Sequence, residues 1–476
     1  MKTKDTVNKE LLNENKGSTA YVFLVCIVAA LGGLLFGYDT AVISGAIGFL
    51  QKHFDLDPQW WTGLAAACTL LGCALGVSVA GILSDRLGRK KVLVISAILF
   101  LISALGTALP RNLTEFIIFR IIGGIGVGAA SITSPMYIAE ISPARIRGRM
   151  VSVNQFAIIS GMLVVYFVNY FIASTNTEAW NVDFGWRWMF GSEALPALLL
   201  LVLLFLVPES PRWLTKQGRC DEALAILSRV GGSQQAKDEL AAIEDAIAQE
   251  GESTAQLFQP GMRIVLVIGV GLAILQQVTG INVFLYYAPE IFKTMGAETD
   301  VALLQTVLVG AVNLAFTIIA IWTVDRLGRK PLMIVGAAGM GISLLAMGLA
   351  AFYQKTEAWL LIFILGYIAC FALSVGPVTW VILSEIFPTR IRGRAMAIAV
   401  VCLWLANYLV TQTFTVMDRA QWLIDKFHHG FPFWVYAAFC VVEVLFLWRF
   451  LPETKGKTLE EIEKHWMGSH SAASCK

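Results

Sequence analysis

The chain has 476 residues, of which 57% are hydrophobic and only 15% are charged. Soluble domains carry about 25% charged residues, so this composition predicts an integral membrane protein. A net charge of +2 argues against a nucleic-acid partner, and the eight cysteines form no CxxC pair. No HExxH, GxSxG or nucleotide-binding loop is found. We therefore expect neither an enzyme nor a metal or other cofactor.

Twelve apolar runs are long enough to cross a bilayer, which takes about 20 residues. The polar segment 1–19 lacks the apolar core of a signal peptide, so we expect a cytoplasmic tail there. The predicted spans are 20–46, 62–84, 91–109, 114–139, 151–173, 188–207, 263–292, 302–323, 331–353, 359–384, 395–417 and 432–451.

The distribution of lysine and arginine predicts that both termini are cytoplasmic. Twelve spans place the termini on one side, and basic residues accumulate in loops on the cytoplasmic side. Of the 36 basic residues, Arg120 lies within a span. The loops on the other side contain only seven, namely Lys52, Arg111, Arg187, Lys293, Lys355, Arg419 and Lys426. We expect a multi-pass protein of the cell (inner) membrane, in contact with the lipid bilayer.

The second half of the sequence repeats the first. GILSDRLGRKK at 81–91 returns as IWTVDRLGRKP at 321–331, and EISPARIRGR at 140–149 returns as EIFPTRIRGR at 385–394. The repeat predicts two six-helix bundles, 20–207 and 263–451, joined by a cytoplasmic helical linker, 208–262, and followed by a cytoplasmic tail, 452–476. Two such repeats are typical of transporters with a midplane substrate site. A membrane enzyme, a receptor or a sensor is the alternative.

Several motifs of the chain resemble those of a known transporter family. The two DRLGRK loops are similar to signatures of the major facilitator superfamily. PESPRW, PETKGKTLEE, FRIIGGIGVG and QQVTGINVFLYY together resemble its sugar porter family, over nearly all of residues 20–465. The resemblance implies an all-α major facilitator fold that acts as a monomer. It also implies symport of a monosaccharide with a proton by alternating access.

Acids and arginines at the cytoplasmic helix ends are predicted to form a latch between the two halves when the cavity opens outward. The alternative is that these arginines only set the membrane topology. The predicted latch residues are Asp85, Arg89, Glu140, Arg149, Glu209, Arg212, Asp325, Arg329, Glu385, Arg394 and Glu453.

We identify three ionisable residues within the spans, Asp39, Arg120 and Glu193. At 1.5 Å per residue, Asp39 lies about 28 Å along the first span and Arg120 about 9 Å along the fourth, with Glu193 in the outer third of the sixth. All three therefore share one level of the first half, and an intramembrane acid is by default functional. Asp39 is the predicted proton carrier, and Glu193 is either an auxiliary acid for the pair or a helix-end residue near the outer face. A static salt bridge between Asp39 and Arg120 is the alternative. The resemblance favours coupling, because proton symporters of the family carry Asp at this position and many facilitative carriers carry Asn.

Amides and aromatic side chains of the second half are predicted to bind sugar, since amides pair with hydroxyl groups and aromatic rings stack on a sugar ring. Polar amides in spans are costly unless they face a cavity or another helix. The candidates are Gln276, Gln277, Asn282, Tyr286, Asn313, Gly376, Trp380, Trp404 and Asn407. The resemblance adds Phe36 and Asn169.

Two positions depart from the family pattern. Met162 and Leu403 stand where similar sugar carriers have amides. A different sugar, weaker binding or engineered substitutions would all fit these changes. D-xylose is the expected substrate, ahead of D-glucose, D-galactose, L-arabinose and D-fructose. A facilitative uniporter and a non-translocating sugar sensor are the alternative functions.

Overall fold

The structure is a computed structural model. It describes residues 18–56, 60–143, 145–248, 260–354, 359–387 and 392–455, without the side chains of residues 260, 261, 325 and 392. The predicted terminal tails and the end of the predicted linker lie mostly outside these residues. Within them, all regular elements are helices. Twelve helical segments are long and apolar enough to cross a membrane. The predicted all-α membrane fold is therefore confirmed.

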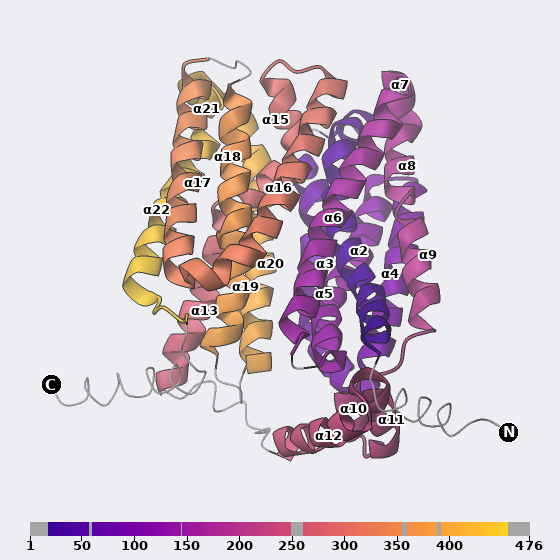
Figure 1. The fold of residues 1–476 in the computed structure, drawn as a ribbon. Helices are drawn as coiled ribbons and strands as arrows, with labels where there is room; N and C mark the ends of the chain where they lie inside the picture. Colours follow the sequence, from indigo (N-terminus) through magenta and orange to yellow (C-terminus); the bar gives the residue numbers. More distant parts are fainter. Residues whose placement is uncertain are drawn as a thin grey trace, which may run out of the picture.

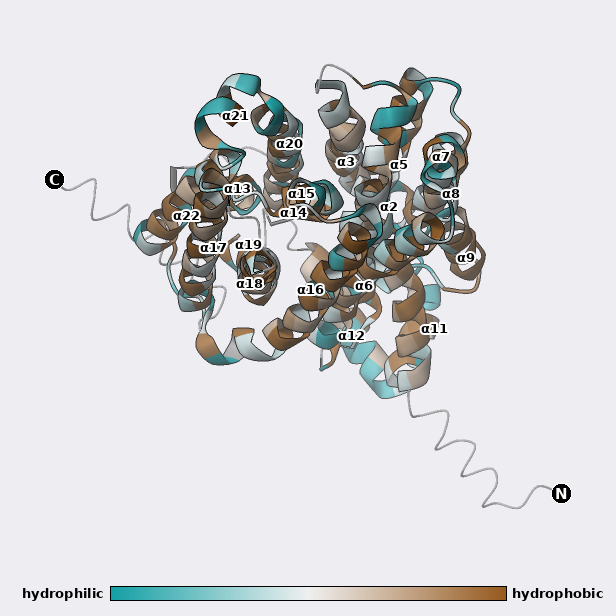
Figure 2. Cartoon of the chain, turned by 90° about the horizontal axis from the view of Figure 1, so that it is seen from above, coloured by the Kyte–Doolittle hydropathy of each residue, from teal (hydrophilic) through white to brown (hydrophobic). Residues whose placement is uncertain are grey.

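The helices form two bundles that lie side by side (Figures 1 and 2), which we call the N-half and the C-half. The N-half consists of α2 (Thr19–His53), α3 (Trp60–Leu87), α4 (Arg89–Ala108), α5 (Leu113–Ile141), α6 (Arg147–Ser174), α7 (Glu178–Trp180), η1 (Asn181–Gly185), α8 (Trp186–Gly191) and α9 (Ala194–Leu204). The C-half consists of α13 (Pro260–Val278), α14 (Ile281–Tyr286), α15 (Ala288–Thr294), α16 (Thr299–Leu327), α17 (Arg329–Phe352), α18 (Leu360–Leu373), α19 (Val375–Ile386), α20 (Arg392–Arg419), α21 (Gln421–Phe427) and α22 (Phe431–Phe450).

Three short helices lie between the halves in sequence and cover one end of the N-half (Figure 1). They are α10 (Pro211–Lys216), α11 (Cys220–Gly231) and α12 (Ser233–Ala248). We call this end of the molecule the linker end and the opposite end the far end.

Apolar side chains cover the outward faces of both bundles. Leu195 is 77% exposed, Trp322 74% and Ile362 68%. Monomeric soluble proteins rarely expose large apolar patches, whereas a lipid-facing surface requires them. The chain is therefore a multi-pass membrane protein.

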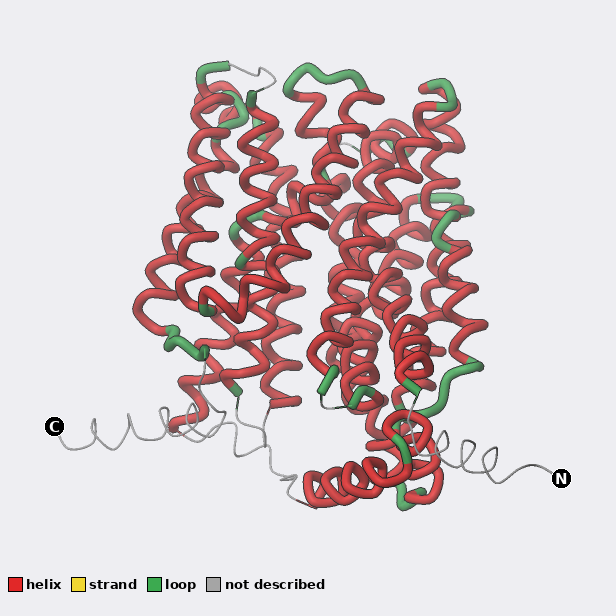
Figure 3. The backbone as a smooth tube through the Cα atoms, viewed as in Figure 1, coloured by secondary structure: helices red, strands yellow, loops and turns green. Residues whose placement is uncertain are grey.

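Three of the spans are interrupted, and the interruptions determine where the interior polar groups lie (Figure 3). The seventh span breaks between α13 and α14 at Gly280, whose φ of 91° is readily adopted only by glycine. The tenth breaks at Ser374, between α18 and α19, rather than at the expected Gly376-Pro377 pair. The sixth begins ten residues earlier than predicted, at Glu178, and a turn at Ser192 and Glu193 precedes α9.

Small residues let α3 and α5 approach each other to backbone contact, which positions the Arg120 turn of α5. A Cβ on Gly72 would lie 2.9 Å from the Gly124 Cα, and a Cβ on Gly124 would lie 3.0 Å from the Cys73 nitrogen. Close approach through small residues is how transmembrane helices gain packing energy, because lipid provides no hydrophobic drive between them.

The two halves touch at the far end, and in Figure 1 they stand apart at the linker end. Gln412 of α20 donates a hydrogen bond to the Trp60 carbonyl at the start of α3, at 2.9 Å. Arg419 donates to the Gln51 side chain of α2, also at 2.9 Å. Tyr166 of α6 donates to the Leu285 carbonyl of α14, at 2.8 Å. The far end is therefore closed by direct bonds between the halves.

Candidate functional site

A buried ion pair in the N-half joins the first and fourth spans. Arg120 Nη1 lies 2.7 Å from Asp39 Oδ1, and both guanidinium nitrogens, Nη1 and Nη2, also donate to the Asp39 carbonyl at 3.2 Å. Asp39 is 0% exposed and Arg120 1% exposed. The structure thus brings together two of the residues predicted for proton coupling.

Glu193, the third predicted residue, reaches the same cluster from the sixth span. It is 1% exposed and lies at the turn before α9, near the middle of its span rather than in the outer third. Its carboxyl group neighbours that of Asp39. Asp39 Oδ2 and both Glu193 oxygens have no donor in the described structure. A single proton shared by the two carboxyl groups would provide the missing hydrogen bond.

Nearby residues shape this cluster. Gly123, one turn along α5 from Arg120, leaves room for Asp39, because a Cβ there would lie 3.3 Å from Asp39 Oδ1. The Phe190 ring lies 5.3 Å from the Arg120 guanidinium carbon, so its face stabilises the cation. Burial of the cluster excludes water, which strengthens the interaction between Asp39 and Arg120.

The predicted amide cluster of the C-half is present at the break of the seventh span. Gln276 Nε2 donates to the carbonyls of Val375 and Gly376, each at 3.1 Å, and so ties this break to the break of the tenth span. Gln277 Nε2 donates to Gln276 Oε1 at 3.2 Å, and Asn282 Nδ2 donates to Gln277 Oε1 at 2.5 Å. The three amides form one chain that a sugar hydroxyl can extend.

Aromatic rings from both halves complete the surroundings of the amides. The Phe36 ring of α2 lies 5.5 Å from the Trp404 ring of α20, which places an N-half residue against the C-half site. Trp404 Nε1 is buried and has no acceptor among the described residues. Tyr286 is buried and hydrogen-bonds to Asn407, while Trp380 is half-buried.

One of the predicted sugar residues, Asn169, bonds within the N-half. Asn169 Nδ2 donates to the Val42 carbonyl at 3.1 Å, and its side chain packs on Gly45, so it ties α6 to α2. Its Oδ1 is buried, and no described residue donates to it, so it can accept from a ligand. Asn313 is buried in α16. Met162 and Leu403, the two departures from the family pattern, are both buried, at 7% and 3% exposure.

At the linker end, the predicted latch residues of the N-half form a network within that half. Arg89 donates from Nε and Nη2 to the two oxygens of Glu140, both at 2.9 Å, and from Nη1 to Asp85 at 3.2 Å. Glu209 accepts from the backbone nitrogens of Arg89 and Lys90, at 2.9 and 3.0 Å. These bonds join α3, α4, α5 and the segment before α10.

The C-half repeats this network at the corresponding positions that the structure describes. Arg329 Nη2 lies 3.0 Å from Glu385 Oε1, and Glu453 accepts from the backbone nitrogens of Arg329 and Lys330 at 3.0 and 3.1 Å. The Asp325 side chain lies outside the described residues.

Neither Arg89–Glu140 nor Arg329–Glu385 joins the two halves in this conformation, which is closed at the far end. The predicted latch between the halves therefore stays a prediction for the opposite conformation. Arg149 and Arg394 are exposed, and Arg212 is half-buried on α10.

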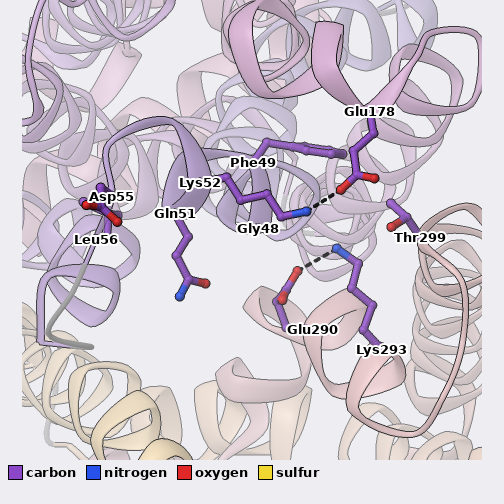
Figure 4. Close-up of a pocket in the computed structure, with 10 residues that line it drawn as sticks. All are labelled: Gly48, Phe49, Gln51, Lys52, Asp55, Leu56, Glu178, Glu290, Lys293 and Thr299. Atoms are coloured by element: carbon purple, nitrogen blue, oxygen red, sulfur yellow. Dashed lines mark hydrogen bonds and ion pairs between the residues drawn. The ribbon is translucent and has the colours of Figure 1, made fainter.

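A charged pocket of about 490 Å³ lies between the halves at the far end (Figure 4). Lys52 pairs with Glu178 on its N-half side, and Lys293 pairs with Glu290 at 2.9 Å on its C-half side. The second pair rests on Gly48 of α2. A Cβ there would lie 3.2 Å from Lys293 Nζ and from the Glu290 carboxyl carbon.

The structure also contains an intramembrane acid that the sequence analysis missed. Glu443 of α22 is 0% exposed, so our count of three ionisable residues within the spans was wrong. A single acid in the middle of the predicted span 432–451 was the signal that could have found it. The Lys52–Glu178 and Lys293–Glu290 pairs of the far-end pocket were also missed, because the two pairs lie far apart in sequence and only the fold brings them to one pocket.

Comparisons with known proteins agree with this arrangement. The family model described as "Sugar (and other) transporter" matches residues 25–466. The D-xylose-proton symporter of Escherichia coli K12 is 50% identical over 475 residues, covering 94% of this chain and 96% of the relative. The arabinose-proton symporter of Bacillus subtilis is 44% identical, with the same coverage. The solved inward-open structure of the E. coli xylose transporter XylE is 48% identical and superposes with a TM-score of 0.83, covering 94% of this chain and all of that one. The chain belongs to the sugar transporter family of the major facilitator superfamily.

Proposed function

We propose that this protein is a proton-coupled monosaccharide symporter of the cell membrane, with D-xylose as its substrate. The observation that carries the proposal is the buried Asp39–Arg120 pair with a second carboxyl group, Glu193, beside it. A uniporter needs no titratable group at this depth, where an unpaired charge costs several kcal/mol. The 50% identity to a relative named as a D-xylose-proton symporter supports both the sugar and the coupling ion.

The charge balance of the cluster suggests how it handles a proton. Asp39 and Arg120 together are neutral, so ionised Glu193 would add an uncompensated charge to a site with at most 1% exposure. Glu193 therefore keeps a proton in this conformation and donates a hydrogen bond to Asp39 Oδ2. A second proton on Asp39 neutralises the carboxylate, which releases Arg120 from the ion pair. Loss of this proton re-forms the pair, so pairing and proton release are one event.

Sugar recognition follows from the amide chain at the broken helices. Gln277 and Asn282 offer donors and acceptors to hydroxyl groups, and the Trp404 ring offers an apolar face and an unpaired Nε1 donor. Gln276 positions this set, because it bonds the two helix breaks together. Leu403 and Met162 supply apolar walls where an amide was expected. This favours a small sugar such as a pentose, which has fewer hydroxyl groups to satisfy.

The far-end bonds and the parted linker end correspond to one conformation of an alternating-access cycle. Basic residues are concentrated on the side of the linker, so we assign the linker end to the cytoplasm and this conformation to the inward-open state. In the outward-open state the linker-end arginines and acids of the two halves meet and form the predicted latch. The sugar and proton groups all come from one chain, which is consistent with a functional monomer.

Uptake by reconstituted proteoliposomes tests the proposal. We expect D-xylose to accumulate against its gradient when the outside is acidified, and an uncoupler to abolish accumulation. Equilibration without accumulation would indicate a uniporter, and binding without uptake would indicate a sensor. Competition by glucose, galactose, arabinose and fructose ranks the substrates. A stronger competitor than D-xylose would reject the assigned sugar and leave the coupling intact.

A further inference from the structure

Glu443 is a buried carboxyl group that the proposed proton and sugar sites do not use. It is 0% exposed, and neither of its oxygens has a hydrogen-bond donor in the described structure. Its neighbours Val442 and Leu445 are 48% and 58% exposed, so they form the lipid face of α22 and Glu443 points into the C-half. An ionised carboxylate without a partner costs several kcal/mol at such a site. Glu443 is therefore a neutral carboxylic acid in this conformation.

Glu443 belongs to a row of polar groups on the inner face of α22. Tyr436, Cys440 and Glu443 are spaced by four and three residues, so they share one side of the helix. Tyr367 of α18 is within electrostatic range of all three. The Tyr436 hydroxyl is buried and has no hydrogen-bond partner within the described part of the chain. We call these four residues the α22 column.

The α22 column packs directly against the helix break that carries the sugar amides. Tyr367 Oη donates to the Thr279 carbonyl at 3.0 Å. A Cβ on Gly280 would lie 2.7 Å from the ring of Tyr436, so this ring covers the break. Gln277 lies three residues before Gly280. A change in the break during transport must therefore change the surroundings of the column.

No described side chain supplies a counter-charge to Glu443. Burial alone therefore sets the cost of ionising its carboxyl group. The described titratable or charged groups on the helices packed against α22, and on α18, are Arg263 of α13, Arg329 and Lys330 of α17, Tyr367 and Cys370 of α18, and Arg394, Cys402, Tyr408, Asp418 and Arg419 of α20. Of these, Tyr367 is the one within electrostatic range of the acid, and a tyrosine is neutral at physiological pH.

We propose that Glu443 is a second proton-binding group of this transporter, protonated in the far-end-closed conformation and ionised when the C-half rearranges around the helix break. In that step the carboxyl O–H bond breaks, water that reaches the site takes the proton, and the carboxylate remains. The reverse step restores the neutral acid. Protons then bias the conformational equilibrium through the C-half as well as through Asp39. This inference rests on the proposed function only in that Asp39 is taken as the first proton-binding group.

The test separates the two acids with a conformational readout. Gly148 and Gly393 are exposed at the linker ends of α6 and α20, and an added Cβ meets nothing within 4 Å at either. Labels on cysteines at these two positions, with the native cysteines replaced, report the separation of the halves across a pH series. In an Asp39→Asn background, falling pH should still shift the population toward the linker-end-open form. Adding Glu443→Gln should abolish that shift, because glutamine mimics the neutral acid.

Two outcomes would overturn the proposal. One is an Asp39→Asn protein without any pH response, and the other is a double variant that keeps the response of Asp39→Asn. If Glu443→Gln does not fold, Glu443→Asp must change the midpoint of the response, and an unchanged midpoint counts against the proposal. Infrared spectra give an independent readout. The protonated-carboxyl absorption of the wild type should fall in Glu443→Gln and keep the part that comes from Glu193, and an unchanged absorption would count against the proposal. Accumulation of D-xylose by the wild type tests the proposed symport separately. Failure of the symport proposal can therefore be distinguished from failure of the Glu443 proposal.

Discussion

The N-half and the C-half have the same six-span plan but place different chemistry in their interiors. The N-half buries a full ion pair on the continuous helices α2 and α5, and a second acid at the turn before α9. The C-half instead buries a chain of amides at one helix break and bonds it to a second break. A charged pair needs a rigid, dry enclosure, because any loosening exposes an uncompensated charge. A sugar needs adaptable donors and acceptors, and a broken helix provides them with free backbone groups. The comparison suggests that the ion pair of the N-half couples transport to the proton and that the amides of the C-half bind the sugar.

The largest effect is expected from Asp39→Asn, which removes the titration of Asp39 and leaves the sugar site intact. Accumulation driven by a pH gradient should vanish, while exchange of labelled for unlabelled sugar should survive at least in part. Asp183→Asn, at an exposed position of the same half, is the matched control. Loss of exchange together with accumulation would favour a static salt bridge, and surviving accumulation would remove Asp39 from coupling.

Gln277→Ala tests the C-half side of the comparison. Loss of this amide leaves a sugar hydroxyl without a partner, which costs about 1–3 kcal/mol, or about 5- to 150-fold in affinity. The thermal unfolding midpoint should change little. Calorimetry of D-xylose binding measures the effect, with Thr413→Ala on the exposed face of α20 as control. Equal affinity in wild type and variant would place the sugar elsewhere.

The two linker-end networks allow a direct comparison of the repeats. Arg89 has a 6% exposed side chain and bonds to both oxygens of Glu140, whereas the Arg329 side chain is 13% exposed and has one bond to Glu385 at 3.0 Å. Arg89→Ala should therefore cost about 1.5–3 kcal/mol of stability, and Arg329→Ala less.

Thermal unfolding in detergent measures these two effects. The control is Arg219→Ala, which breaks an exposed pair with Glu222 and should change nothing measurable. The reverse order would mean that bond number and burial do not set the strength of these networks.

Gly48→Phe tests the contact between the halves at the far end. A ring at this position must displace the Glu290–Lys293 pair that rests on Gly48, which should shift the population toward the far-end-open form. Labels at the linker end should then move closer together. Gly81→Phe on α3, where an added Cβ meets nothing within 4 Å, should leave the distance unchanged. An unchanged distance in Gly48→Phe would show that the pocket does not hold the halves together.

The smallest effect concerns His429, in the loop before α22. The hydrogen bond that His429 Nδ1 donates to Asp418 Oδ1, at 3.1 Å, raises the pKa of His429 above its ordinary value of 6.5. The contribution to stability is fully present below pH 6.5 and is lost as the pH rises through the raised pKa. The thermal unfolding midpoint of the wild type should therefore fall as the pH rises from 6.5 through the raised pKa. In His429→Gln this fall should be smaller. His53→Gln, in the N-half, is the comparison, and identical pH profiles for wild type and His429→Gln would contradict the assignment.

Sequence patterns alone predicted the class of the fold, the twelve spans and the repeat. These features depend on the sequence itself, since a bilayer requires about 20 apolar residues per span and the repeat is a similarity between two stretches of sequence. Asp39 and Arg120 could also be selected from sequence, because a charge within an apolar run is conspicuous. The amide cluster at Gly280 was similarly visible, since glycine beside polar residues marks a broken span.

Tertiary structure alone decided which of these groups meet. Asp39 and Arg120 are 81 residues apart, and only the packing of α2 against α5 brings them to 2.7 Å. The packing of the Glu290–Lys293 pair on Gly48 and the burial of Glu443 against the helix break depend on contacts between distant segments. Sequence periodicity gives the depth and the face of a residue, but partners are set by how helices rotate and cross. For this reason the sequence indicated what the charged groups are, and the fold determined which of them share an enclosure.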